Sequence, residues 1–287
     1  MTRLIGISGR KQAGKNTTAN FMYGNKMLEH ELVKDFRIGD DGSLQVYTAN
    51  SAGVLDWGLV DITSHDSAFL EYAEQEIWPY IKLYSFSDAL KAMCVKLLGI
   101  SYTDAYGNDV QKSTLTHIRW ENMPGVIADA ELWNHILELY PEGLEPVDLI
   151  YHEKGYMTAR EVMQYFGTEV MRRIHGPIWI DSTMKRIKEE GPEIAIIADV
   201  RFPNEADAVL DEDGELIRLT RFIEDNHISE TALNPQNFDQ NKFTYLVDNQ
   251  DKDIGYTLKK VGQIYREEIK KVEFVGFRPK AITSALK

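Results

Sequence analysis

Short apolar runs alternate along this chain with longer stretches that carry apolar residues at helical spacing. Buried strands are predicted over residues 3–8, 81–86 and 194–198, and two further strands over 215–219 and 245–247. The run Ile194–Ala198 is apolar at every position, which is typical of a central strand in a parallel sheet. Strands that alternate with helices predict an α/β fold around a central, mostly parallel sheet of five strands.

The predicted helices fill most of the intervals between these strands. Residues 15–32 carry an apolar stripe, Asp88 caps a helix through Leu98 that Gly99 ends, and residues 254–271 form a closing helix. The sequence Thr158-Ala159-Arg160-Glu161 is a capping box that opens another helix. We expect Gly167 to break that helix and a second one to start near Thr168.

Two stretches interrupt the alternation. Residues 36–63 alternate irregularly around Gly39-Asp40-Asp41-Gly42, which is typical of a hairpin or of short inserted strands. Residues 100–157 are rich in turns but contain apolar residues that need burial. The sequence therefore predicts a single domain over 1–287 with insertions at about 33–80 and about 100–157.

The segment Gly9–Thr17 lies between the first predicted strand and the first predicted helix. It matches the phosphate-loop pattern G-x-x-x-x-G-K, with Asn16 in place of the usual Ser or Thr. Glycines let backbone amides turn inward, the helix adds the positive end of its dipole, and Lys15 could reach the outer phosphates of a nucleoside triphosphate. Asn16 and Thr17 could offer oxygens to Mg²⁺. The alternative interpretation is a glycine turn between two ordinary elements.

Asp199 and Arg201 follow the most apolar predicted strand, and Glu205 comes four residues later. Ligands of doubly wound sheets bind beyond the carboxyl ends of the strands. An acidic residue at such a strand end anchors Mg²⁺ in phosphate-loop enzymes. The alternative is a surface pair of Asp199 and Arg201.

Charge is distributed unevenly along the chain. The net charge is −13, which argues against a general nucleic-acid binder. Seven of the 13 arginines nevertheless lie between residues 160 and 221. Because arginine forks match phosphate oxygens, this cluster suits phosphoryl transfer, whereas the alternative is a set of solvated helix faces, as we expect for Arg186.

Composition narrows the class of protein further. Hydrophobic residues make up 43% of the chain, and no apolar run approaches the roughly 20 residues of a membrane span. Cys94 is the single cysteine, so no internal disulfide can form. We expect a soluble, cytosolic protein in which Cys94 is a packed, inert thiol.

Several blocks, taken in order, resemble the deoxynucleoside monophosphate kinases of bacteriophages. They are Gly9–Thr17, Phe86–Lys91, Arg160–Glu169 with Arg172, Trp179, and Asp199–Glu205, and the stretch Asp225–Glu230 and the turn at Asp248 and Asn249 also fit. The resemblance covers most of the chain and is weakest over 31–80 and 125–155. It implies a three-layer P-loop kinase fold with inserted substrate-binding and lid segments, and it makes 100–157 a monophosphate-binding subdomain.

The resemblance also implies roles for individual residues. ATP would be held by Gly9, Lys11, Gly14, Lys15, Asn16 and Thr17, and Mg²⁺ by Asn16, Thr17 and Asp199. The monophosphate would be held by Arg160, Gln164, Gly167, Thr168, Trp179, Asp199, Arg201 and Glu205. Catalytic roles would fall to Lys15, Arg172, Asp199 and Arg201. Trp179 is alternatively plain core, and Gln164 an ordinary helix residue.

A lid would complete such a site. One of Arg172, Arg218 and Arg221 is expected to close over the transferring group, with Asp225, His227, Ser229 and Glu230 in the lid or beside it. The sequence does not decide which arginine does so.

The expected function is transfer of the ATP γ-phosphate to deoxynucleoside monophosphates. Two alternatives stay open: a P-loop kinase for another small phosphorylated acceptor, and an ATP-binding regulatory module. A GTPase is disfavoured because no N-K-x-D guanine motif occurs. We expect small-molecule partners, a possible homodimer, no nucleic-acid or membrane partner, and a host-cytoplasmic location if the source is a phage.

Overall fold

The computed structural model describes residues 2–49, 53–64, 66–140, 149–221 and 231–269. The chain divides into two compact units, which are described separately. The first contains Met1–Phe86 and Thr183–Lys287, and the second contains Ser87–Ser182. The predicted insertion at 33–80 thus belongs to the first unit, and that at 100–157 belongs to the second.

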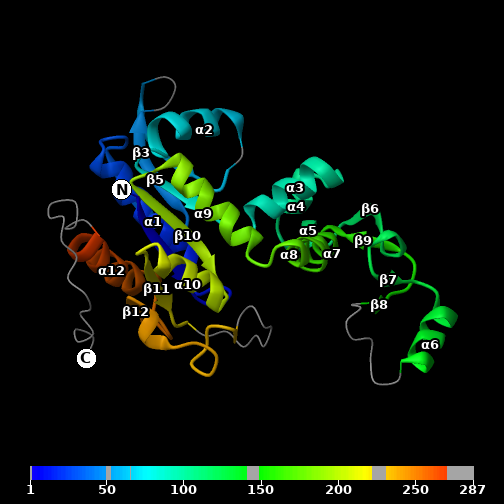
Figure 1. Ribbon diagram of the computed structural model, residues 1–287. Helices are drawn as coiled ribbons and strands as arrows, with labels where there is room; N and C mark the ends of the chain where they lie inside the picture. The colour runs from blue at the N-terminus through cyan, green and yellow to red at the C-terminus, as the bar shows by residue number, and fades with distance from the viewer. Residues whose placement is uncertain (1, 50–52, 65, 141–148, 222–230, 270–287) are drawn as a thin grey trace. The chain divides into compact units, whose positions relative to one another are not determined.

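A five-stranded sheet forms the centre of the first unit (Figure 1). Its strands are β1 (Arg3–Ser8), β5 (Ile81–Tyr84), β10 (Ile194–Val200), β11 (Glu215–Leu219) and β12 (Tyr245–Val247), in the order β12-β11-β1-β10-β5. All four pairings are parallel, which confirms the predicted α/β class and central sheet. Ser8 pairs with Val200, so the segments that follow β1 and β10 leave the same edge of the sheet.

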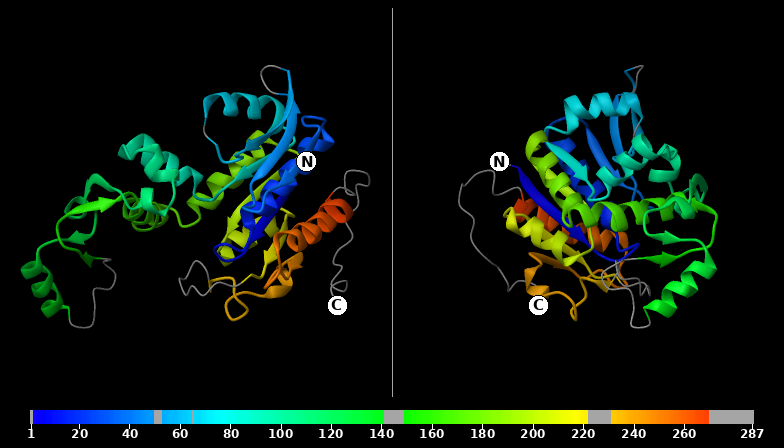
Figure 2. Two further views of the ribbon diagram at one scale, coloured as in Figure 1. Left: turned by 180° about the vertical axis from the view of Figure 1, so that it is seen from behind. Right: turned by 45° about the vertical axis from the view of Figure 1, so that its right-hand side comes forward.

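Helices cover the apolar side chains of this sheet. They are α1 (Lys15–Glu29), α9 (Ile178–Glu190), α10 (Pro203–Asp211) and α12 (Ile254–Ile264), the last continuing as the π-helical turn η5 (Tyr265–Ile269). Ile5 and Ile7 are buried in one core with Met22 of α1 and Tyr265 of η5. The α1 helix packs against α12 and against β10 (Figure 2). Because side chains alternate along a strand, α1 and α12 with η5 cover the face of β1 that carries Ile5 and Ile7.

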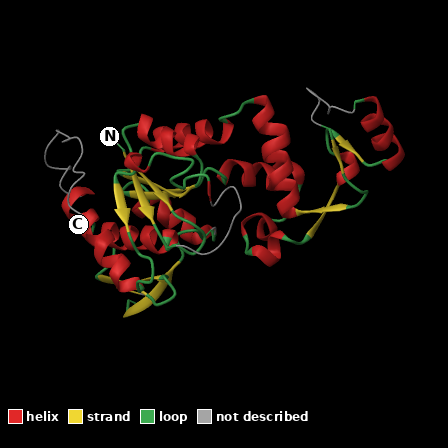
Figure 3. Cartoon of the chain, turned by 90° about the horizontal axis from the view of Figure 1, so that it is seen from below, coloured by secondary structure: helices red, strands yellow, loops and turns green. Residues whose placement is uncertain are grey.

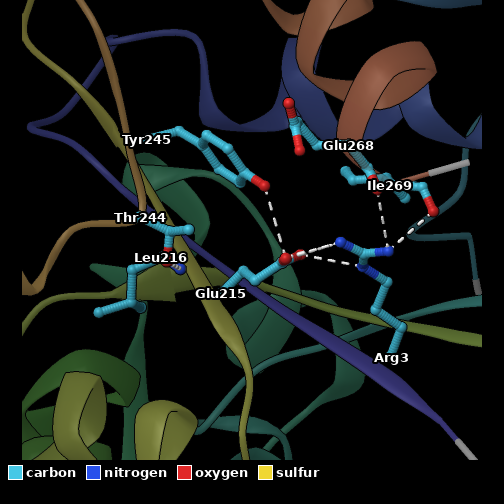
Figure 4. A network of polar contacts seen from close by, with 7 residues as sticks. All are labelled: Arg3, Glu215, Leu216, Thr244, Tyr245, Glu268 and Ile269. Atoms are coloured by element: carbon cyan, nitrogen blue, oxygen red, sulfur yellow. Dashed lines mark hydrogen bonds and ion pairs between the residues drawn. The ribbon is translucent and has the colours of Figure 1, made fainter. Parts of the chain in front are cut away.

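A polar network ties η5 to the sheet (Figure 4). Arg3 forms an ion pair with Glu215 at 2.6 Å and donates to the carbonyls of Glu268 and Ile269. The hydroxyl of Tyr245 lies 3.4 Å from the same Glu215 carboxylate. The first residues of β1, β11 and β12 are therefore held together beside η5.

The insertion in the first unit is larger than the predicted hairpin. Three antiparallel strands, β2 (Asp35–Ile38), β3 (Leu44–Ala49) and β4 (Leu55–Val60), are followed by α2 (Ser67–Tyr72) and the π-helical turn η1 (Ala73–Ile77). The hairpin itself is β2–β3, and its turn contains Gly42 at φ 83°. Leu44 and Val46 point into the main core, which attaches this small sheet to the unit.

The prediction of a first helix over 15–32 is wrong at its end. The α1 helix stops at Glu29, and Glu31 has φ 57°, a left-handed conformation that a helix cannot contain. The amide of Leu32 donates to the carbonyl of Met27 at 3.0 Å, and the Leu32 side chain packs against the core. Leu32 thus fits the apolar stripe without belonging to the helix.

Outside residues 141–148, which are not described, the second unit consists of helices and four short strands (Figure 3). The elements are α3 (Asp88–Leu98), α4 (Tyr102–Tyr106), α5 (Asp109–Lys112), β6 (Leu115–Arg119), η2 (Trp120–Asn122), β7 (Val126–Ile127), α6 (Ala130–Leu139), β8 (Ile150–Tyr151), β9 (Tyr156–Thr158), α7 (Ala159–Tyr165), η3 (Phe166–Met171) and α8 (Arg172–Ile174). Gly99 ends α3 at φ 66°, as predicted. Cys94, Met157 and Val162 are at the centre of a separate core.

The predicted helix break at Gly167 is wrong. The capping box of Thr158 and Glu161 opens α7 as expected, but the helix continues through the π-helical stretch η3 into α8. A Cβ at Gly167 would lie 2.8 Å from Cδ2 of Leu90 on α3. This glycine therefore permits close packing of two helices, a use that a single sequence does not distinguish from helix termination.

Among the described residues, none of the helices combines the length and apolar character that crossing a bilayer requires.

Candidate functional site

Residues 9–14 form a tight loop between β1 and α1, and Lys15, Asn16 and Thr17 are the first residues of α1. Gln12 at φ 60° and Gly14 at φ 97° are both left-handed, and Gly14 is the N-cap of α1. A Cβ at Gly9 would lie 3.0 Å from Cβ of Ala13 and 3.2 Å from the carbonyl oxygen of Leu219. Both glycines of the pattern are thus required by the backbone.

Lys15 folds back across this loop. Its Nζ donates to the carbonyl of Gly9 at 2.6 Å and to that of Arg10 at 2.8 Å. The first turn of α1 has no side-chain cap and no acidic residue. The positive end of the helix dipole and the ammonium group are therefore close together, an arrangement that favours an anion.

The two candidate magnesium ligands on α1 differ in their surroundings. Asn16 is exposed, whereas Thr17 is half-buried. The β2–β3 turn lies against Thr17, because a Cβ at Gly42 would be 2.3 Å from Thr17 Oγ1, and Asn20 donates to the Gly42 carbonyl at 2.8 Å. The insertion that the sequence left without a role thus contacts the first two turns of α1.

Asp199 lies near the carboxyl end of β10. Its Oδ2 accepts a hydrogen bond from Ser85 Oγ at 2.5 Å, whereas its Oδ1 is buried and has no hydrogen-bond partner. Within the part of the chain that the structure describes, the one other such side-chain oxygen is Thr18 Oγ1, on α1. A buried carboxylate oxygen without a partner is costly unless a ligand or cation completes it.

This donor set fits magnesium. Asp199, Asn16 and Thr17 offer carboxylate, amide and hydroxyl oxygens, the ligands that a hard divalent cation prefers. The described residues contain no cluster of three or more His, Cys, Asp and Glu side chains arranged around a metal position. A cation here would therefore take further ligands from water and phosphate oxygens, as Mg²⁺ commonly does.

Glu205 supports the turn between β10 and α10. The side chain is buried, with 6% exposure, and its Oε2 accepts hydrogen bonds from the backbone amides of Arg201 at 2.9 Å and Phe202 at 3.2 Å. Arg201 is half-buried at this turn. Glu205 thus fixes the backbone of Arg201, while its predicted contact with substrate stays a prediction.

The arginines proposed for a lid occupy different elements. Arg218 lies in β11 and donates through Nη1 to Ser8 Oγ at 2.8 Å. Arg221 follows β11 and donates through its side chain to the carbonyl of Lys252. Arg172 is exposed at the start of α8. Asp225, His227, Ser229 and Glu230 lie outside the described residues.

A cavity of about 390 Å³ in the second unit brings two predicted substrate residues together. Gln164, in α7, and Thr168, in η3, both line it. The lining as a whole consists of Trp120, Leu149, Ile150, Glu161, Gln164, Tyr165, Thr168, Glu169 and Arg173. It therefore combines aromatic surface with groups that can form hydrogen bonds.

Trp120 is a lining residue that sequence reasoning missed. Its ring stacks on His152 at a centroid distance of 3.9 Å and meets Tyr165 edge-on at 5.8 Å. The sequence identified Trp120 only as an apolar residue that needs burial. Because the lining comes from separate segments of the chain, no local sequence motif predicts it.

The other acceptor residues predicted in the second unit do not line this cavity. Arg160 forms an exposed ion pair with Asp109 at 2.7 Å. Trp179 is 5% exposed, and its indole nitrogen donates to the carbonyl of Gly167 at 3.2 Å. This contact gives Trp179 a packing role beside η3, and its contact with a base stays a prediction.

Comparison with known proteins agrees with the resemblance read from the sequence. A family profile described as deoxynucleotide monophosphate kinase matches residues 95–252, more than half of the chain. The chain is 28% identical over 158 residues to deoxynucleoside-5'-monophosphate kinase of Escherichia phage T5, an alignment that covers 49% of this chain and 60% of that relative. The chain thus belongs to the deoxynucleotide monophosphate kinases, a family of transferases.

Proposed function

We propose that this protein transfers the γ-phosphate of ATP to deoxynucleoside 5'-monophosphates. The alignment covers only 60% of the phage T5 relative, so the activity in that relative's name is proposed for this chain and not taken over as a fact. The observation that carries it is the glycine loop between β1 and α1, which has the backbone and the lysine that a triphosphate needs. This loop lies outside residues 95–252, so it supports the proposal independently of the family match.

We further propose a three-layer P-loop kinase fold with lid segments for the first unit. On β1, Ile5 and Ile7 pack with α1, while a Cβ at Gly6 would lie 3.3 Å from Val209 of α10. Neighbouring positions of one strand therefore meet different helices, which supports layers on both faces of the sheet. ATP would contact Gly9, Lys11, Gly14, Lys15, Asn16 and Thr17.

The cavity in the second unit would take the base of the monophosphate. Gln164 offers one donor and one acceptor to a base edge, and Trp120 offers an aromatic surface. These groups favour a nucleotide over a phosphorylated sugar or isoprenoid, which would need no flat wall. Arg160 and Arg201 remain candidates for the acceptor phosphate, each within its own unit.

Asp199, Asn16 and Thr17 would hold Mg²⁺. Bound there, the cation would neutralise charge on the phosphate oxygens. The unpartnered Oδ1 of Asp199 supports this assignment.

The reaction would be an in-line displacement. An oxygen of the acceptor phosphate forms a bond to the γ-phosphorus, the bond to the β-phosphate oxygen breaks, and ADP leaves. The attacking phosphate is ionised near neutral pH, so no strong general base is required. Two anions must approach each other, and Lys15 and the arginines offset their repulsion, so catalysis consists of positioning and charge neutralisation.

The phosphate loop is tested with Lys15→Ala, using Lys185→Ala as a matched control because Lys185 is exposed on α9. Loss of the loop ammonium should reduce turnover by about 100-fold or more. Thermal unfolding should change little, and Lys185→Ala should behave as the wild type. Near-normal turnover in the Lys15 variant would remove the loop from the chemistry.

The phage T5 relative further suggests that the protein acts in the cytoplasm of a host cell.

The open alternatives are a kinase for a different phosphorylated acceptor and a binding module without transfer. ADP release measured with a panel of acceptors separates them.

A further inference from the structure

Asn249 is a buried polar residue that the site described so far does not use. It follows β12, and its exposure is 1%. Its Nδ2 donates to the carbonyl of Ala13 in the phosphate loop at 2.8 Å. Its Oδ1 accepts the backbone amide of Arg221 at 2.7 Å. The carboxamide thus connects two segments that are 208 residues apart in sequence (Ala13 to Arg221, 221 − 13).

The loop end of this bridge has left-handed backbone on both sides of Ala13. Ala13 is fully buried between Gln12 and Gly14, both of which are left-handed. A non-glycine residue in this region costs free energy and persists only where the surroundings hold it. The hydrogen bond from Asn249 is an external restraint on the central residue of this strained turn.

The other end of the bridge belongs to a firmly bonded pair of turns. Thr220 Oγ1 donates to Asp248 at 2.8 Å, the Thr220 amide donates to the carbonyl of Val247 at 3.2 Å, and the Arg221 side chain donates to Lys252. The turns that follow β11 and β12 are therefore held together by hydrogen bonds. Within these two turns, Asn249 contacts the phosphate loop through its hydrogen bond to Ala13.

We propose that Asn249 is a positioning residue that holds the phosphate loop in the shape that binds a nucleoside triphosphate. The proposal rests on the proposed function of that loop. It assigns Asn249 no contact with substrate: the residue acts through Ala13, and it couples the loop to the backbone of Arg221. Loss of the carboxamide therefore weakens triphosphate binding and leaves monophosphate binding intact.

The test compares Asn249→Asp and Asn249→Ala with Thr220→Val in the full chain. The Asp variant keeps the acceptor for the Arg221 amide and removes the donor to Ala13, whereas the Ala variant removes both without adding charge. Thr220→Val breaks the neighbouring bond to Asp248 and leaves the loop contact in place. Calorimetry measures the dissociation constants of ATP with Mg²⁺ and of each deoxynucleoside monophosphate.

Both Asn249 variants should raise the dissociation constant of ATP about tenfold or more, because a buried hydrogen bond to a strained loop is lost. The dissociation constants of the monophosphates should stay within about twofold in all variants, and that of ATP should also do so in Thr220→Val. Retained monophosphate binding reports that the second unit is folded, and an unchanged thermal unfolding transition reports the same for the first unit.

Three results would overturn the inference: unchanged ATP binding in both variants, an ATP defect confined to the Asp variant, or equal weakening of ATP and monophosphate. The second would indicate charge repulsion, and the third a general loss of structure. Failure of the proposed function of the loop looks different, because then the wild type itself would bind no ATP.

Discussion

The two carboxylate oxygens of Asp199 have different surroundings. Oδ2 is hydrogen-bonded to Ser85, whereas Oδ1 is buried without a partner. A structural carboxylate would normally satisfy both oxygens, so this geometry supports the proposed ligand role of Oδ1. The sequence predicted Asp199 from its position after a buried strand, but only the structure separates the two oxygens.

Replacing Asp199 with Asn therefore tests a site role against a structural one. The amide oxygen can still accept the hydrogen bond from Ser85, and the buried charge is removed. The melting temperature should stay the same or rise, while turnover with ATP and Mg²⁺ should fall by about 100-fold. Ser85→Ala is the control, since it keeps the charge and should retain most of the activity. A destabilised but active Asp199→Asn variant would contradict this assignment.

Cys94 illustrates a residue whose role is packing. The side chain is fully buried on α3, and burial raises the pKa of its thiol to about 11. The reactive thiolate is therefore scarce at neutral pH.

The native protein near neutral pH should not react with a thiol-specific reagent, and the unfolded protein should incorporate one equivalent. The measurement is mass spectrometry after timed alkylation with and without denaturant. Rapid labelling of the native chain would show that the thiol is accessible and reactive. Cys94→Ala should retain activity, because the thiol takes no part in the proposed reaction.

At the scale of elements, local sequence signals predicted where helices and strands lie, but they did not predict which elements contact each other. The strand of Ile194–Val200, the capping box at Thr158 and the stop at Gly99 were readable because each depends on neighbouring residues. Gly167 was misread because its reason is Leu90, 77 positions away (167 − 90). A glycine that admits a neighbouring side chain and one that ends a helix look alike in a single sequence.

The β2–β3 turn offers an element-scale prediction. Gly42 has φ 83° and lies against Thr17 of α1, whereas Gly53 has φ 75° and a Cβ added there would have open space within 4 Å. Gly42→Ala should destabilise the protein by about 1 kcal/mol or more beyond Gly53→Ala, because both incur left-handed strain but only one meets Thr17. Chemical denaturation of the two variants measures the difference.

Equal destabilisation by the two substitutions would contradict this account. It would mean that the turn does not rest on α1, and that the insertion of β2, β3 and β4 leaves the first turns of that helix uncovered.

At the scale of the whole molecule, an acidic chain concentrates its arginines in one part of the sequence. The net charge is −13, yet Arg201, Arg218 and Arg221 all lie near the ends of β10 and β11. Arg173 lines the cavity of the second unit. Arg186 instead pairs with Glu190 on α9, in line with the surface role expected for it. Local positive charge of this kind suits the phosphates of a small molecule.

The candidate site was only partly predictable from sequence, because some of its residues are brought together from distant segments. The phosphate loop is a contiguous motif, and Asp199 comes at the end of an apolar strand, so both can be identified from local sequence. The cavity residue Trp120 and the bridging Asn249 depend on which distant segments the fold brings together. For Trp179 the sequence left an aromatic wall and plain core open; the structure shows a buried contact with Gly167, and contact with a base stays a prediction.

The most direct test of the central claim is phosphoryl transfer from ATP with Mg²⁺ to each of the four deoxynucleoside monophosphates. Ribonucleoside monophosphates and phosphorylated sugars serve as control acceptors, and Lys15→Ala is the inactive enzyme. The account predicts that at least one deoxynucleoside diphosphate forms in step with ADP, and that the Lys15 variant forms none at a comparable rate. Transfer to a phosphorylated sugar alone, or ATP binding with no transfer to any acceptor, would contradict it.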